Sequence, residues 1–243
     1  MSEHCSLRRD VPKASAPARY NCEIAYRGCN PMFLRGTRCI VLALLALLLA
    51  CSGPVRAADA PPALLVLGDS VSAGYGLPAG KGWVTLLDAR LKSEGYRYSV
   101  VNASISGDTT AGGRARLPAL LAQHKPTIVV IELGGNDALR GGNLAATRAN
   151  LENMVTAAQA AKARVMIIGM QMPSNYGPVY VKDFSALFSD VAKAKRVPLV
   201  PAFFAGFGED LTLFQPDRIH PTAEAQAKLL DNVWPTLKTL LRK

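Results

Sequence analysis

The chain has 243 residues, of which 49% are hydrophobic and 19% are charged, and its formal net charge is +10. This composition indicates a folded globular protein with a sizeable core and excludes a low-complexity or highly charged disordered chain. Residues 1–57 carry eight of the 28 Lys and Arg but three of the 18 Asp and Glu, so residues 58–243 are only mildly basic. The sequence has no dense basic tract with interleaved aromatic residues, and nucleic-acid binding is therefore not expected.

The N-terminal part of the sequence has the layout of an export signal. Arg35 and Arg38 precede an apolar run over 39–50. This run is too short to span a bilayer comfortably and suits the core of a signal peptide. We expect a signal peptide over 32–57 with cleavage after Ala57, and hence a periplasmic or secreted protein.

Other features of this region leave alternatives open. The sequence Leu-Leu-Ala-Cys that ends at Cys51 is a loose lipobox, so lipidation of Cys51 is the alternative to simple cleavage. Residues 1–31 are polar and irregular, and we expect them to be an extension that is not normally translated. All five Cys residues lie within the first 51 positions, so the rest of the chain has no disulfide framework, thiol nucleophile or thiolate metal site.

From residue 63 onward, short apolar runs alternate with amphipathic segments. The runs predict buried strands, and apolar stripes at helical spacing predict helices. In chain order, we expect strands over 63–68, 96–105, 127–135, 164–170 and 197–201, and helices over 83–95, 115–125, 151–158, 184–191 and 229–241. Pro118 is expected to start or kink the second of these helices.

Strands that alternate with helices indicate βαβ units. They predict a single α/β domain over 58–243 with a parallel sheet covered by helices on both faces. In such a sheet the functional site lies beyond the carboxyl ends of the strands. This rule singles out four loops, which hold Gly68-Asp69-Ser70, Gly107, residues 134–137 and Met172.

Ser70 directly follows the first predicted strand. A helix that begins there would direct backbone N–H groups and the positive end of its dipole at this position. A serine so placed can attack a carbonyl while its own N–H helps to hold the oxyanion, but Gly-Asp-Ser is also a common turn and helix cap. The flanking residues fit neither the G-x-G-x-x-G fingerprint nor the G-x-S-x-G nucleophile elbow.

A serine hydroxyl needs a base to become a nucleophile, and His220 is a candidate. Asp217 lies three positions before His220 in the irregular segment PDRIHPTAEAQ. The Asp217 carboxylate can accept a hydrogen bond from Nδ1–H and leave Nε2 free as the base. From these two residues alone, a structural explanation is equally good: Asp217 would form a turn, and His220 would bond to the backbone. A metal site is a third possibility, but it would have only these two candidate ligands.

Gly107 and Asn136 are candidate donors for an oxyanion. Gly107 follows the second predicted strand, where a missing side chain lets a backbone N–H approach a substrate closely. Asn136 follows the third predicted strand and offers a side-chain amide. Each residue alone is also compatible with an ordinary turn. Together with Ser70 and the Asp217–His220 pair, they place a nucleophile, a base and two donors at one edge of the sheet.

The candidate residues fall into four short blocks, namely Gly68-Asp69-Ser70, Gly107, Gly135-Asn136-Asp137 and Asp217-x-x-His220. In order and spacing, these blocks resemble the four blocks of the SGNH (GDSL) hydrolase family. The resemblance covers about residues 63–241. It implies a three-layer α/β/α, flavodoxin-like fold with a five-stranded parallel sheet, and the hydrolysis of acyl esters and thioesters without a metal or cofactor.

The resemblance also assigns roles to individual residues. It implies that Ser70 is the nucleophile, that His220 is the general base and acid, and that Asp217 orients the imidazole. The backbone N–H groups of Ser70 and Gly107 and the side chain of Asn136 would form the oxyanion hole.

Five further residues receive expected roles. Leu139, Met172 and Tyr176 are candidates for an acyl-binding surface. Asp69 and Asp108, each next to a block glycine, are expected to bond loop backbone beneath the site.

The expected partner is a small-molecule acyl ester or thioester, with membrane lipids among the candidate substrates, and the protein is expected to be a monomer. Two alternatives stay open. One is a carbohydrate O-acetylesterase, against which the apolar residues Leu139 and Met172 argue. The other is a non-catalytic periplasmic lipid binder, against which the complete Ser, His and Asp set argues.

Overall fold

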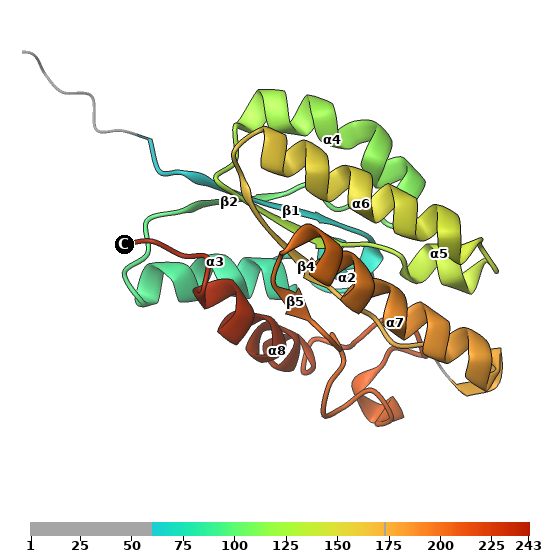
Figure 1. Ribbon diagram of the computed structural model, residues 1–243. Coiled ribbons are helices and arrows are strands. Elements are labelled where there is room, and N and C mark those ends of the chain that lie inside the picture. The colour runs from blue at the N-terminus through green and yellow to red at the C-terminus, as the bar shows by residue number, and fades with distance from the viewer. Residues whose placement is uncertain (1–59, 173) are drawn as a thin grey trace, which may run out of the picture. The chain divides into compact units, whose positions relative to one another are not determined.

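The computed structural model describes residues 60–172 and 174–243 (Figure 1). The predicted signal peptide over 32–57 and the extension over 1–31 lie outside these residues. No helix in the described ranges is both long enough and apolar enough to cross a membrane.

A single five-stranded parallel sheet forms the centre of the domain, which confirms the predicted α/β fold (Figure 1). In spatial order the strands are β2, β1, β3, β4 and β5, and every neighbouring pair is parallel. The register aligns Leu65 of β1 with Val101 of β2 on one side and with Val129 of β3 on the other. The strand bounds are β1 (Ala63–Gly68), β2 (Ser99–Asn102), β3 (Ile128–Glu132), β4 (Arg164–Ile168) and β5 (Leu199–Val200).

Helices cover both faces of the sheet (Figure 1). On one face α4 packs on α6 and α6 packs on α7, and on the other face α3 packs on α8. A strand buried on both faces has no solvent-facing positions, which is why β1 and β3 are continuous apolar runs rather than alternating ones. The helix bounds are α3 (Trp83–Ser93), α4 (Thr110–His124), α6 (Leu144–Ala160), α7 (Pro178–Lys195) and α8 (Gln226–Lys238).

The start of α4 differs from the sequence-based expectation. We expected a helix over 115–125 that Pro118 starts or kinks, but α4 begins at Thr110 and holds Pro118 in its interior. Thr109 caps it by accepting a hydrogen bond from the N–H of Gly112. The glycines in the first turn hid this start because they are poor helix formers. Gly113 is needed for packing, since a Cβ there would lie 2.3 Å from Cδ1 of Leu133.

Several short elements follow the carboxyl ends of the strands. The one-turn helix α2 (Ser70–Ala73) follows β1, and α5 (Gly135–Leu139) follows β3. The 3-10 turns are η1 (Ser174–Tyr176) and η2 (Leu211–Leu213). The chain leaves β1 for β2 on one side and then returns to β3 on the other, so the direction of winding reverses between β1 and β3. In open α/β sheets the site lies at this switch point, and α2 and α5 flank it.

Candidate active site

Ser70, His220 and Asp217 meet at the switch point in one hydrogen-bonded chain. Oγ of Ser70 lies 2.8 Å from Nε2 of His220. Nδ1 of the same ring lies 2.7 Å from Oδ2 of Asp217. With its proton on Nδ1, the imidazole donates to the carboxylate, and Nε2 accepts the hydrogen bond from the serine hydroxyl. The structure therefore brings together the three predicted residues in the geometry of an activated nucleophile.

The loop around Asp217 keeps this carboxylate ionised. Oδ1 accepts hydrogen bonds from the backbone N–H groups of Ile219, at 2.9 Å, and of His220, at 3.0 Å. Partial burial raises the pKa of Asp217, but the hydrogen bonds from His220 and Ile219 outweigh it and bring the pKa below its usual value. A charged Asp217 can orient the imidazole and stabilise the imidazolium that forms during the reaction.

Two residues that the sequence analysis did not single out support His220. The ring of Tyr75 packs against the imidazole, with the ring centroids 4.6 Å apart. Gln215 donates its backbone N–H to the carbonyl of His220 at 2.7 Å and its side-chain amide to the carbonyl of Tyr75 at 2.8 Å. These bonds tie the His220 loop to the segment after α2. No local sequence pattern marks the bond between Gln215 and Tyr75, because these two residues lie 140 positions apart in the chain.

The predicted oxyanion donors face the same cavity as the nucleophile. Ser70, Gly107 and Asn136 all line it, at the ends of β1, β2 and β3. Gly107 has a φ of +77°, in the left-handed region that favours glycine. Nδ2 of Asn136 donates to Oδ2 of Asp69 at 3.0 Å, which fixes the orientation of the amide and leaves its second N–H for another acceptor.

Asp69 and Asp108 both bond loop backbone, as expected. Oδ1 of Asp69 accepts the N–H of Val71 at 3.0 Å and so caps α2, and Oδ1 of Asp108 accepts the N–H of Thr109 at 2.9 Å. Burial raises the pKa of Asp69 to about 6, against the lowering effects of the Val71 bond, the nearby His220 and the Asn136 bond. Because Asp69 also accepts the hydrogen bond from Nδ2 of Asn136, it positions this predicted oxyanion donor, a role that the sequence analysis did not anticipate.

Asp137 joins the second and third blocks. Its Oδ2 accepts the backbone N–H of Thr110 at 2.9 Å, and its Oδ1 accepts the hydroxyl of Thr110 at 2.5 Å. Thr110 is the first residue of α4, and Asp137 directly follows Asn136 in α5. The bond pair therefore fixes the loop that carries Gly107 relative to the helix that carries Asn136.

A fully buried carboxyl group, Glu132, lies beneath the nucleophile at the end of β3. Its Oε2 accepts the hydroxyl of Ser72 at 2.5 Å and the N–H of Asp69 at 3.3 Å, and Nε1 of Trp83 in turn donates to Ser72 at 3.2 Å. Burial, followed by the nearby charge of Asp69, raises the pKa of Glu132 well above its usual value. A neutral acid here anchors α2, which begins with Ser70. The sequence analysis did not single out Glu132, although an acidic residue at the end of an apolar run could have indicated it.

Replacing Asp69 with asparagine should flatten the pH dependence of stability between about pH 4 and 6. The pKa of Asp69 is about 6 in the fold and 3.8 ordinarily, so the folded state holds this proton more tightly than the unfolded chain does. The resulting stabilisation is complete below the ordinary pKa and is lost as the pH rises through the folded pKa. At about 1.4 kcal/mol per pKa unit, the loss is about 3 kcal/mol.

Urea unfolding of the wild type and Asp69→Asn, followed across this pH range, measures the difference. The matched control is Asp190→Asn, which removes an exposed carboxylate on α7 that pairs with Arg148. This control should keep the wild-type slope of unfolding free energy against pH. An equally steep slope in Asp69→Asn would contradict the assignment.

The cavity over Ser70 has a volume of about 1240 Å³ and largely apolar walls. Leu139 and Met172, two of the three predicted acyl-binding residues, line it. Tyr176 does not: it lies on η1, outside the cavity lining, and is partly exposed. Tyr176 lies only four positions after Met172, but the next lining residues along the chain, Val181 and Ser185, belong to α7. Residues that line the cavity and were not predicted include Met170, Val181, Phe204, Phe207 and Phe214.

Within residues 60–172 and 174–243, no three His, Cys, Asp or Glu side chains gather as potential metal ligands. Asp217 bonds to His220, and His220 in turn bonds to Ser70.

A serine hydroxyl bonded to a histidine that a carboxylate orients, with candidate donors lining the same cavity, is the constellation of a serine hydrolase. The chain belongs to the GDSL-like lipase/acylhydrolase family, whose family model matches residues 66–228. It is therefore an enzyme of the ester-hydrolysing class, as the four sequence blocks predicted.

Individual relatives agree with this family. The chain is 56% identical over 178 residues to Esterase TesA of Pseudomonas aeruginosa, covering 73% of this chain and 89% of the relative. It is 43% identical to Thioesterase 1/protease 1/lysophospholipase L1 of Escherichia coli, covering 76% and 87% of the two chains. The crystal structure of a psychrotrophic esterase, EstA from Pseudoalteromonas sp., inhibited by monoethylphosphonate, is 38% identical, with a TM-score of 0.69 over 73% of this chain and 97% of that one.

Proposed function

We propose that this enzyme hydrolyses carboxylic esters and thioesters of acyl chains through an acyl-enzyme formed on Ser70. The observation that carries the proposal is the 2.8 Å contact between Oγ of Ser70 and Nε2 of His220, with Asp217 on the far side of the ring. The names of the relatives, which include an esterase, a thioesterase/lysophospholipase and an arylesterase, support the same substrate class.

In the first half of the reaction, Nε2 of His220 takes the hydroxyl proton as Oγ of Ser70 bonds to the substrate carbonyl carbon. The carbonyl electron pair moves onto the oxygen, and the N–H groups of Ser70 and Gly107 and the amide of Asn136 hold the resulting oxyanion. When this intermediate collapses, the bond to the leaving oxygen or sulfur breaks, and His220 gives its proton to the leaving group.

In the second half, a water molecule attacks the acyl-enzyme and gives a proton to His220. The second tetrahedral intermediate breaks the bond to Oγ, which recovers its proton from His220, and the carboxylic acid leaves. Asp217 stays ionised throughout, because it stabilises the imidazolium in both halves without taking the proton.

The walls of the cavity support an apolar acyl chain as the substrate group. Leu139, Met170, Met172 and Val181 line the same cavity as the proposed oxyanion donors. An acetyl group would leave these side chains uncovered, which disfavours a carbohydrate O-acetylesterase. Each CH₂ group that the walls bury contributes about 0.8 kcal/mol, or roughly a three- to fourfold gain in kcat/KM.

We further propose, from the sequence alone, that the enzyme is exported after cleavage near Ala57 or is lipidated at Cys51. We also propose that it acts as a monomer. Membrane-derived lysophospholipids would then be within its reach.

The test is a chain-length series of p-nitrophenyl esters, a lysophospholipid and an acyl-CoA, with a p-nitrophenyl phosphonate as a covalent probe. We expect kcat/KM to rise from acetate to medium chains, and the phosphonate to label Ser70 in the mass spectrum. A steady fall from acetate onward would favour the O-acetylesterase. Absence of label on Ser70, together with tight acyl binding, would indicate the non-catalytic lipid binder.

A further inference from the structure

We propose that Arg116 of α4 is a positioning residue, which sets the spacing between the two backbone donors of the oxyanion hole. This role rests on the proposed function, since it concerns how well the site holds a tetrahedral intermediate. Arg116 lies outside the four sequence blocks and does not line the cavity.

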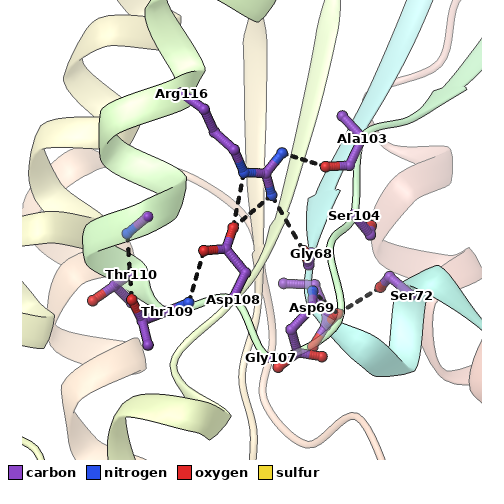
Figure 2. Close-up of polar contacts among 12 residues, drawn as sticks. Gly68, Asp69, Ser72, Ala103, Ser104, Gly107, Asp108, Thr109, Thr110 and Arg116 are labelled. Carbon is purple, nitrogen blue, oxygen red and sulfur yellow. Dashed lines mark hydrogen bonds and ion pairs between the residues drawn. The ribbon is translucent and has the colours of Figure 1, made fainter. Parts of the chain in front are cut away.

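The guanidinium of Arg116 contacts three separate pieces of backbone or side chain (Figure 2). Nε and Nη2 both lie 2.8 Å from Oδ2 of Asp108. Nη1 donates to the carbonyl of Ala103, and Nη2 also donates to the carbonyl of Gly68 at 3.3 Å. One planar group therefore joins the end of β1 to the loop that follows β2.

These contacts lie next to the two donors in the chain. Gly68 is two positions before Ser70, and Asp108 directly follows Gly107. The N–H of Ile105 also donates to the carbonyl of Gly68, at 3.1 Å, so both segments meet at this one oxygen. A shift of Arg116 would change the distance between the N–H groups of Ser70 and Gly107, and these groups must converge on a single oxygen atom.

The ion pair between Arg116 and Asp108 is enclosed by the surrounding residues. The exposed fractions of the side chains are only 20% for Arg116 and 10% for Asp108. Gly112 makes room for the carboxylate, since a Cβ at that position would lie 2.0 Å from Oδ1 of Asp108. An enclosed pair of this kind needs all its hydrogen bonds, and arginine alone offers a rigid planar fork that serves a carboxylate and two carbonyls at once.

A purely structural role is the competing explanation, and Arg164 provides the matched control. Arg164 begins β4, at the opposite edge of the sheet from the site. Its guanidinium likewise joins distant segments, donating to the carbonyl of Leu240 and to the hydroxyl of Tyr98. Its replacement should cost stability without moving the oxyanion donors.

The experiment compares Arg116→Met, Arg116→Lys and Arg164→Met with the wild type and Ser70→Ala, using p-nitrophenyl butyrate. Each variant is assayed below its own melting temperature. We expect Arg116→Met to lower kcat about 10- to 100-fold with KM within about twofold, because a misplaced donor weakens only the transition state. Arg116→Lys keeps the charge but not the fork, and should lower kcat about 3- to 10-fold. Arg164→Met should lower the melting temperature and leave kcat unchanged.

A second measurement separates positioning from general loosening of the fold. The affinity for an alkyl trifluoromethyl ketone, which mimics the tetrahedral oxyanion, should fall in Arg116→Met and Arg116→Lys in proportion to kcat/KM. If Arg116→Met does not fold, Arg116→Lys alone tests the proposal. A wild-type kcat in Arg116→Lys would overturn the positioning role of Arg116. If the wild type and Ser70→Ala turn over the substrate at the same rate, the proposed function is overturned, and the role of Arg116 with it.

Discussion

Ser70→Ala is expected to lower kcat by about 10⁴- to 10⁶-fold while KM and the melting temperature stay close to wild type. The reason is geometric: Oγ of Ser70, which lines the cavity, is the hydroxyl that lies 2.8 Å from Nε2 of His220. Loss of one buried hydroxyl leaves the cavity walls and the oxyanion donors in place. Substrate should therefore still bind, and a small residual rate should remain from the donors alone.

His220→Ala should be about as severe, because the nucleophile then lacks its base. The double variant should be no worse than either single variant, since residues that act as one unit are not additive. Ser185→Ala is the matched control: Ser185 also lines the cavity, but from α7, and its loss should change kcat less than about threefold. Near-wild-type turnover by Ser70→Ala would rule out the acyl-enzyme mechanism. Steady-state kinetics and circular dichroism melting curves supply the readouts.

The number and order of the strands and the end of β1 were predictable from the sequence, whereas the segments predicted for the other four strands ran one to three residues past their observed ends. β1 and β3 are apolar on both faces, so their runs stop abruptly where the chain leaves the core, and polar residues there mark the edge of the sheet. Parallel strands place all their carboxyl ends at one edge. This geometry alone brings Ser70, Gly107 and Asn136 together, without knowledge of any side-chain contact.

Several contacts that support the site from outside the four sequence blocks were not predictable. Arg116, Gln215 and Tyr75 act on residues far away in the chain, and their own neighbours in sequence carry no sign of it. The sequence shows Glu132 as an acidic residue after an apolar run. It does not show that Glu132 is buried beneath Ser72, which bonds to it, and Trp83, which bonds to Ser72. Sequence periodicity reports which face of an element is buried, whereas these partners depend on how separate elements meet.

Removal of the side-chain donor should have the second-largest effect among the substitutions. We expect Asn136→Ala to lower kcat by about 10²- to 10³-fold with little change in KM. Asn136 is held for this role, because one hydrogen of its amide is fixed on Oδ2 of Asp69 at 3.0 Å. Its contribution should therefore appear when charge develops on the substrate oxygen, and not when the neutral ester binds.

Gln159→Ala is the matched control, because it also removes a side-chain amide donor but at a position away from the site. Gln159 on α6 donates to the carbonyl of Lys195 on α7, and its removal should leave kcat unchanged. Asn136→Ala should also raise the pKa of Asp69 further, because the Asn136 bond is one of the influences that lower it. An unchanged kcat would exclude Asn136 as a donor. A fall in kcat without a matching loss of affinity for the trifluoromethyl ketone would mean that Asn136 acts only by placing Asp69 and α2.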